Sequence, residues 1–116
     1  MSVRVRRIYD PPESGDGLRV LVDRLWPRGL AKDAARIDEW PKDITPSTEL
    51  RRWFHSGEGS FEDFRGRYEA ELDGPEAAQL LDGLRESARK GPVTLLTASK
   101  TPEQSHASVL AELLGR

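Results

Sequence analysis

A chain of 116 residues with a net charge of −2 and no cysteine excludes several classes of protein. The length suits one domain over residues 1–116 and leaves no room for a separate cofactor domain. Without cysteine there can be no disulfide, no thiolate nucleophile and no zinc–sulfur site. No apolar run approaches the roughly 20 residues of a membrane helix, and residues 1–7 lack the apolar core of a signal peptide. We therefore expect a cytoplasmic protein without a membrane partner.

Charge is distributed unevenly along the chain. Residues 1–30 hold six Arg against four Asp and Glu, whereas the rest of the chain is acidic overall. Proteins that bind nucleic acid without sequence preference usually carry a basic surface, and the net charge argues against one here. Nucleic acid is therefore an unfavoured partner, although the basic N-terminal third leaves that alternative open.

Three segments are predicted to be strands. Val3–Arg6 alternates apolar and charged residues, as an edge strand does. Leu18–Val22 is a second, more buried strand, and Val93–Thr97 is apolar enough for a central strand buried on both faces. Residues 9–17 have the composition of a loop. Asp38–Ile44 contains a proline and is predicted to be a short edge strand or an extended segment.

The remaining segments predict helices, several of them with recognisable N-terminal caps. Lys32–Ile37 is a short helix, and a longer one begins at Pro75. Thr45 is predicted to cap a helix with proline at its first position, and Ser60 is predicted to cap the next. Thr101 begins a capping box at the start of the last helix.

The pattern of these elements predicts the fold class. Strands mixed with helices of ten or more residues indicate a single compact α/β domain, with a small, mostly parallel or mixed sheet flanked by helices. Apolar stripes at helical spacing put Trp53, Phe64, Leu81 and Leu110 in the core.

The loop Asp23–Gly29 follows the second strand and is the first candidate site. Ligands of α/β proteins bind beyond the carboxyl ends of strands. Arg24 and Arg28 could clamp an anion while Asp23 orients one of them, and the alternative is an internal ion pair that pins the loop. Trp26 either stacks on a ligand or plugs the edge of the core.

The loop Ser99–Thr101 follows the buried strand and is the second candidate. A strand that ends at a helix N-terminus presents free N–H groups to an anion, and Lys100 adds a positive charge beside Ser99. The alternative is an ordinary capped helix with a solvated lysine. If the two strands are parallel neighbours, Lys100 faces the same cleft as Arg24 and Arg28.

The two histidines give weaker signals. His106 lies on the apolar stripe of the last predicted helix, so it is either a half-buried side chain or a proton-transfer group facing the strand end. His55 precedes a glycine-containing turn and is expected to be exposed. A triad of Ser99 or Ser105 with His106 lacks the Gly-x-Ser-x-Gly elbow. The histidines show no metal-ligand spacing, so we expect no metal and no cofactor.

Several stretches resemble the YeaO-like family of small bacterial proteins, catalogued as domain of unknown function 488. These stretches are Arg7–Pro11, Leu21–Gly29, Asp38–Trp40, Pro46–Arg51 and Val93–Leu96. Together they span nearly the whole chain. The resemblance implies a single compact α/β domain and supplies no agreed catalytic residues.

The chain departs from this family pattern around the last strand and helix. Relatives often carry an aromatic residue at the position of Thr97, or a cysteine in distant branches. They often have Asp or Asn at Thr101 and Asn at Ser105. The smaller hydroxyl residues here argue against fixed chemistry in this loop, and a cysteine-based mechanism cannot apply.

Two classes of function remain at this stage. The first is a site for an anionic ligand, bearing phosphate or carboxylate, at Asp23–Gly29 and Ser99–Thr101, with or without catalysis. The second is a non-catalytic protein- or nucleic-acid-interaction module that uses the basic N-terminal third or the acidic–aromatic patch of Glu39, Trp40 and Asp43. Clustering of the cations in one cleft favours the first class, and their dispersal in ion pairs favours the second. Enzymatic activity and oligomeric state stay open.

Overall fold

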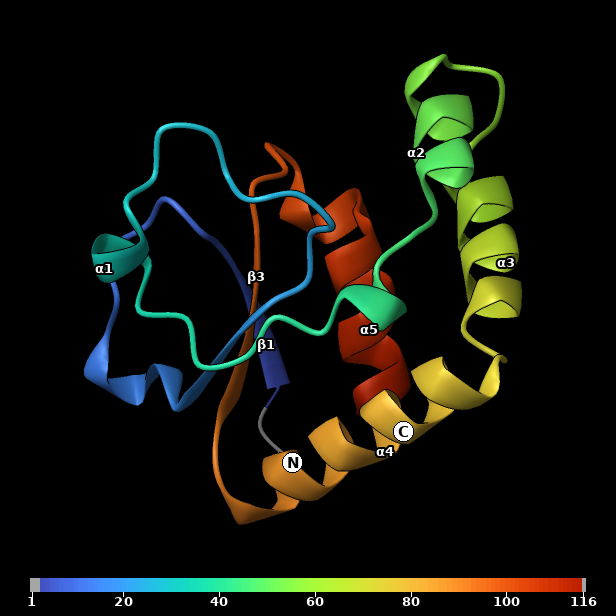
Figure 1. Cartoon of the computed structure of the whole chain (residues 1–116). Helices are drawn as coiled ribbons and strands as arrows, with labels where there is room; N and C mark the ends of the chain where they lie inside the picture. Colours follow the sequence, from blue (N-terminus) through green and yellow to red (C-terminus); the bar gives the residue numbers. More distant parts are fainter. Residues whose placement is uncertain (1–2, 116) are drawn as a thin grey trace.

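The computed structural model describes residues 3–115. Met1 and Ser2 lie outside the described residues, and the predicted absence of a signal peptide depends partly on them. The elements are shown in Figure 1. The strands are β1 (Val3–Arg7), β2 (Leu18–Leu21) and β3 (Val93–Thr97). The α-helices are α1 (Lys32–Ala35), α2 (Thr48–His55), α3 (Phe61–Glu71), α4 (Pro75–Lys90) and α5 (His106–Leu114). Three short 3-10 helices are η1 (Ser14–Asp16), η2 (Lys42–Ile44) and η3 (Pro102–Gln104).

The strands form one parallel sheet in the order β1-β3-β2. Val93 pairs with Val3 on one side and with Leu18 on the other. Every residue of β3 is buried, so the prediction of a central strand is confirmed, as is the edge position of β1. Because all three strands are parallel, their carboxyl ends lie at one edge of the sheet.

The two faces of the sheet are covered differently, because successive side chains of a strand point to opposite faces. Val93 and Leu95 pack into the main core with α3, α4 and α5. Leu96 points the other way and packs with Ile8 and Ala35 in a smaller cluster. Figure 1 accordingly shows α2–α5 on one side and the segment carrying α1 on the other. The predicted α/β class is thus confirmed as a small parallel sheet flanked by helices.

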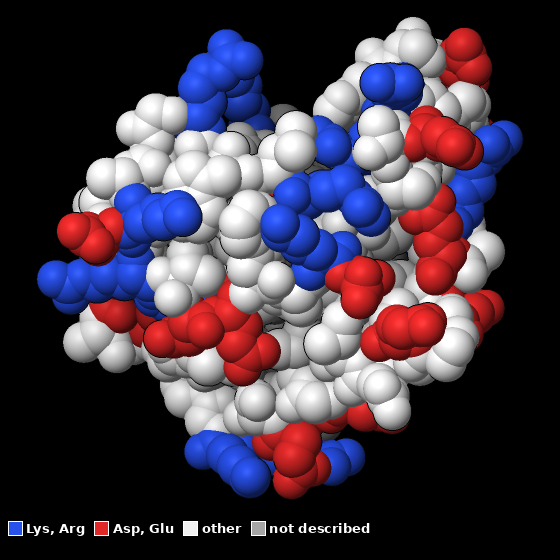
Figure 2. Space-filling model, viewed as in Figure 1, with Lys and Arg blue, Asp and Glu red and all other residues white. Residues whose placement is uncertain are grey.

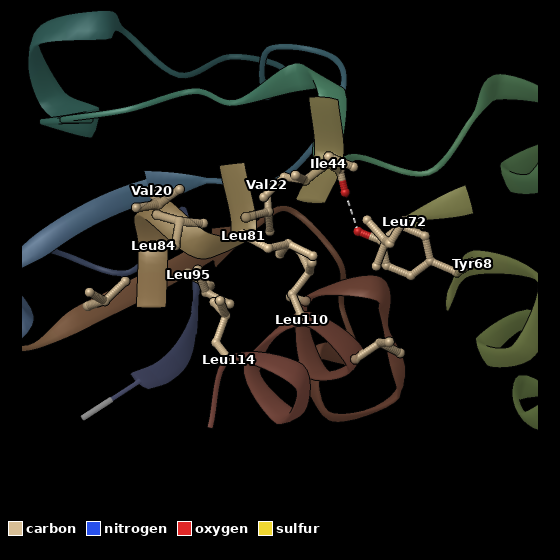
Figure 3. Packing of buried hydrophobic residues seen from close by; sticks show 14 of the residues in the cluster. Val20, Val22, Ile44, Tyr68, Leu72, Leu81, Leu84, Leu95, Leu110 and Leu114 are labelled. Carbon is tan, nitrogen blue, oxygen red and sulfur yellow. Dashed lines mark hydrogen bonds between the residues drawn. The ribbon is translucent and has the colours of Figure 1, made fainter. Parts of the chain in front are cut away.

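Three of the four predicted core side chains are buried. Phe64, Leu81 and Leu110 are at most 6% exposed, whereas Trp53 is half-buried and carries the guanidinium of Arg67 over its ring. Figure 3 shows Leu81 and Leu110 within the cluster. No helix within residues 3–115 has the length and apolarity to cross a bilayer.

The predicted cap of α2 is wrong by two residues. The hydroxyl of Thr45 donates to the carbonyl of Lys42 at 2.6 Å and closes the η2 turn. Ser47 caps the helix instead, and its Oγ accepts from the N–H of Leu50 at 3.1 Å. The tight turn competes successfully for the threonine, because a hydroxyl can hydrogen-bond nearby backbone groups in several local conformations.

The predicted capping box at Thr101 is wrong for a similar reason. Residues 102–104 form only the η3 turn, and Thr101 makes no side-chain cap. Ser105 lies in an extended conformation and caps α5 by accepting from the N–H of Ala107 at 3.2 Å. The cap predicted at Ser60 is confirmed, and it forms a reciprocal capping box with Asp63.

The segment Asp38–Ile44 is extended only at its start. Glu39 makes a single parallel bridge to Val20 of β2, after which the chain turns through η2. The predicted helix at Lys32–Ile37 ends early, at Ala35, because Arg36 adopts a left-handed conformation with φ 49°.

Candidate functional site

One cavity opens at the edge of the sheet where the strands end, and its volume is about 500 Å³. Figure 2 shows a notch at the upper edge of the molecule, with Lys and Arg side chains on both of its sides. The walls come from the segment after β2, from α2 and α3, and from the loop between β3 and α5. The lining residues are Tyr9, Asp23, Arg24, Leu25, Trp26, Pro27, Arg28, Pro46, Arg51, Phe54, His55, Phe64, Thr97, Ala98, Ser99, Lys100, Thr101, Gln104, Ser105 and His106.

The six residues predicted from the sequence all line this cavity. They are Asp23, Arg24, Arg28, Ser99, Lys100 and His106. They converge because β2 and β3 are parallel neighbours, so the loops that follow the two strands leave the sheet at the same edge.

The carboxylate of Asp23 forms the most highly connected group of the cavity. Its Oδ1 accepts from the hydroxyl of Thr97 and lies beside Nε2 of His106, each at 2.8 Å. Its Oδ2 accepts from the N–H of Ala98 at 2.7 Å. The interpretation that Asp23 orients an arginine, or pairs with one, is therefore wrong, because the carboxylate binds β3 and α5 instead.

The same contacts keep Asp23 charged. Burial raises the pKa of the Asp23 carboxyl, but the hydrogen bond and the electrostatic interaction with His106, together with the bonds from Ala98 and Thr97, lower it by more. The net result is a pKa below the usual value. The negative charge of Asp23 is therefore present at neutral pH, and protein donors already stabilise it.

The hydroxyl groups beside His106 are engaged in local turns. Ser105 Oγ donates to the carbonyl of Pro102 at 2.8 Å, and Ser99 Oγ accepts from the N–H of Thr101 at 3.2 Å. Within residues 3–115, no serine or threonine hydroxyl is hydrogen-bonded to His106, so no nucleophile–base pair is assembled. Nor do three His, Asp or Glu side chains of this described part converge as metal ligands would.

Four cationic side chains line the cavity without an acidic partner. Arg24 donates only to backbone carbonyls, those of Pro46 at 3.2 Å and Thr45 at 3.5 Å. Arg28 and Lys100 are exposed, and Arg51 is half-buried. Among the described residues, no ion pair reaches any of the four. Asp23 is the sole carboxylate among the lining residues, so the cavity is electropositive.

The contribution of α2 to this cavity was not predicted. Arg51, Phe54 and His55 line the wall that faces the β3–α5 loop. Their spacing of three and four residues places them on one helical face, which is a signal that the sequence does contain. His55 is exposed as predicted, but it lies at the cavity mouth.

The indoles of Trp26 and Trp40 fix the shape of the cavity wall that is formed by the segment after β2. Trp26 donates to the carbonyl of Leu30 at 2.7 Å, and Trp40 donates to the carbonyl of Asp23 at 2.6 Å. Their rings meet edge to face with centroids 5.5 Å apart. Trp40 therefore supports the backbone of Asp23 without lining the cavity itself. Trp26 makes structural contacts and also lines the cavity.

Three of the six arginines in residues 1–30 are paired with one buried aspartate at the opposite end of the sheet from the cavity. Asp16 is 1% exposed and binds the guanidiniums of Arg4, Arg6 and Arg19. Arg7 ends β1 at the cavity edge of the sheet, where it donates to the carbonyl of Ser99 at 3.1 Å. These four arginines therefore hold the fold together and do not form a free basic surface.

A comparison by family profile and a comparison with individual proteins point to the same family. The sequence profile that describes the inactive DUF488-N3 subclade matches residues 2–116. The chain is 49% identical over 114 residues to the uncharacterized protein YeaO of Escherichia coli (strain K12), covering 98% of this chain and 97% of that protein. It is 46% identical over 112 residues to uncharacterized proteins of Mycobacterium tuberculosis and Mycobacterium bovis, covering 97% of this chain and 92% of each relative. No solved structure matches the chain significantly.

Proposed function

We propose that this chain, which belongs to the YeaO-like DUF488 family, binds a small anionic ligand in the cavity at the strand ends and does not transform it. The ligand carries a phosphate or a carboxylate group. Arg24, Arg28, Arg51 and Lys100 provide the positive potential, and the aromatic side chains of the walls exclude water from it.

The charge balance of the cavity lining carries this proposal. Four Lys and Arg side chains face one carboxylate, Asp23, which already interacts with Thr97, Ala98 and His106 and with none of the four cations. Surface cations of a protein with a net charge of −2 would ordinarily be interspersed with acids. Arg28 and Lys100 come from loops 72 residues apart, and both present their charge to the same space.

Two observations favour binding without turnover. The hydroxyls of Ser99 and Ser105 are engaged in turns, so neither is paired with His106 as a nucleophile is paired with its base. In addition, the subclade whose profile matches is described as inactive. A protein that keeps a binding cavity but has no activated nucleophile is suited to carry or sense its ligand.

The interaction-module alternative has less support. Arg4, Arg6 and Arg19 are bound to Asp16, so they are not available as a phosphate-contacting surface. Trp40 is occupied by Asp23 and by Lys42, whose ammonium lies 4.2 Å from the ring centroid.

A thermal-shift experiment at constant ionic strength tests the proposal. Phosphate, sulfate, succinate, a short DNA duplex and a DNA single strand are each added to the parent protein, to Arg28→Ala and to Arg89→Ala. Arg89 lies on α4 outside the cavity and pairs with Glu86, so it controls for loss of an arginine. An anion at about 100 times its Kd stabilises the fold by about 2.7 kcal/mol, which is a rise of several degrees in Tm for a domain of this size.

The expected result is a rise in the parent and in Arg89→Ala, with a smaller rise in Arg28→Ala. No rise with any anion, or an equal rise in all three proteins, would contradict the proposed site. A rise with duplex or single-stranded DNA alone would favour the interaction module.

A further inference from the structure

The cavity is chemically divided between its mouth and its floor. Arg28 and Lys100 at the mouth are exposed. Asp23 on the floor has a side chain only 17% exposed, and Phe64 in the lining is 2% exposed. A ligand that fills the cavity therefore meets positive charge outside and one negative charge, with an aromatic surface, inside.

The carboxylate of Asp23 retains one unused acceptor position. An ionised carboxylate has about four lone-pair sites. Oδ1 is engaged by Thr97 and His106, whereas Oδ2 accepts, among residues 3–115, only from Ala98. Asp23 also lines the cavity, so a ligand group with an N–H or O–H can donate a further hydrogen bond to Oδ2. An anionic group at the same place would be repelled by the carboxylate.

The size of the cavity excludes a bare inorganic anion as a good fit. A volume of about 500 Å³ lies within the range of about 300–1,000 Å³ that is typical of sites for organic ligands. Apolar and aromatic side chains, notably Trp26, Phe54 and Phe64, line the same cavity as the cations. Phe54 and Phe64 stack with ring centroids 4.5 Å apart, which makes this part of the wall aromatic.

We propose that the ligand is a phosphomonoester with a neutral, ring-shaped organic body, which rests on the proposed anion-binding function. Its phosphate lies at the mouth between Arg28 and Lys100. Its body packs against the aromatic wall and donates a hydrogen bond to Oδ2 of Asp23. Asp23 is thus a specificity-determining residue that favours ligands with a hydrogen-bond donor and weakens, without abolishing, the binding of inorganic phosphate. A phosphate is favoured over a carboxylate because four cations face one acid in the lining.

Titration calorimetry with five probes tests this assignment. Inorganic phosphate has no body, phenyl phosphate has a ring without a donor, and 4-aminophenyl phosphate adds an N–H donor. Ribose 5-phosphate carries hydroxyl donors on a differently shaped ring, and 4-aminobenzoate replaces the phosphate by a carboxylate. We expect at least one donor-bearing phosphate to bind roughly tenfold more tightly than inorganic phosphate, as a hydrogen bond to a charged group allows.

The variant Asp23→Asn identifies the residue responsible, since it keeps the shape and removes the charge. It should bind inorganic phosphate more tightly than the parent does and should lose the preference for 4-aminophenyl over phenyl phosphate. If this variant is unstable, the order of affinities of the five probes in the parent protein tests the preference for a donor-bearing phosphomonoester.

The outcomes distinguish a wrong ligand class from the absence of an anion-binding site. If inorganic phosphate binds as tightly as every ester, or 4-aminobenzoate binds as tightly as 4-aminophenyl phosphate, the ligand class is wrong while the anion site stands. An unchanged ranking in a folded Asp23→Asn protein overturns the role of Asp23. If none of the five binds, both this inference and the anion site are overturned.

Discussion

His106 lies with its Nε2 2.8 Å from Oδ1 of Asp23 and thereby joins the first turn of α5 to the segment that follows β2. The same carboxylate reaches the end of β3 through Thr97 and Ala98. Three elements are therefore tied together at one charged group on the cavity floor. The exposed cations Arg28 and Lys100 form no ion pair with an acid of the described residues 3–115, so they can adjust to a ligand.

This arrangement predicts loss of stability in acid. The pKa of Asp23 in the folded chain lies below the value of about 3.9 for an unfolded aspartate. Its contribution to the free energy of unfolding is therefore complete above about pH 5 and is lost as the pH falls through the folded pKa. Urea unfolding between pH 7 and pH 3 should show a shallower decline for Asp23→Asn than for the parent. Equal declines would assign the effect to other carboxylates, such as Asp16.

Asp16 is expected to be the carboxylate on which stability depends most. Its removal in Asp16→Ala leaves Arg19, which is 5% exposed, as a buried charge without its acidic partner. Breaking a buried pair in this way costs about 3–5 kcal/mol. Glu13→Ala is the control, since the Glu13 side chain is 57% exposed and lies 3.6 Å from the same Arg4. Denaturant melts should show a change below about 1 kcal/mol for the control, and comparable losses in both variants would refute the prediction.

The hydrophobic core gives a prediction with a matched leucine control. Leu110 is fully buried, whereas Leu25 is 65% exposed in the loop after β2. Leu110→Ala should cost about 2–5 kcal/mol through the lost burial and the cavity that remains. Leu25→Ala should change the free energy of unfolding by less than about 0.5 kcal/mol. A loss below roughly 1 kcal/mol for Leu110→Ala would show that α5 is not packed as described.

Two glycines should respond to alanine with opposite signs. Gly17 adopts φ 64°, and a Cβ there would lie 2.2 Å from the carbonyl oxygen of Pro92. Gly17→Ala must therefore displace the junction between η1 and β2 and should destabilise by more than 1 kcal/mol, on the order expected for an incompatible backbone. At Gly83 in α4 a Cβ meets nothing within 4 Å, so Gly83→Ala should stabilise by up to about 1 kcal/mol. Destabilisation of both variants in chemical melts would contradict the account.

The sequence predicts that the loops after two strands form the site together. It does not predict that α2 contributes a wall of the cavity. Leu18–Val22 and Val93–Thr97 are the two most apolar strand-like runs, which predicts that they are neighbours; that they are parallel is a condition of the predicted site, and the structure meets it. Arg51 could not be assigned in the same way. Its helix is followed by a turn and by α3, and the direction in which this pair packs depends on long-range contacts, such as the hydrogen bond from Tyr68 to Ile44 (Figure 3).

Local hydrogen-bond competition explains the errors in detail. Thr45 and Thr101 each precede a proline, which is the pattern of a helix start, yet a tight turn forms at both places and serine takes the cap. Asp23 beside Arg24 suggests an ion pair, but the neighbours of Asp23 in space are Thr97, Ala98 and His106. Residues more than 70 positions away cannot be paired by spacing alone, so the partner of this carboxylate became evident only from the fold.

The most direct test of the anion site is to locate binding on the molecule. Amide chemical shifts of ¹⁵N-labelled protein are followed during titration with phosphate at constant ionic strength, in the parent and in Arg28→Ala. We expect saturable shifts of the non-proline amides within residues 23–28, 51–55 and 97–106, weakened in the variant, with little change around Asp16 at the opposite end of the sheet. Shifts concentrated near Asp16, or no saturable shifts at all, would contradict it.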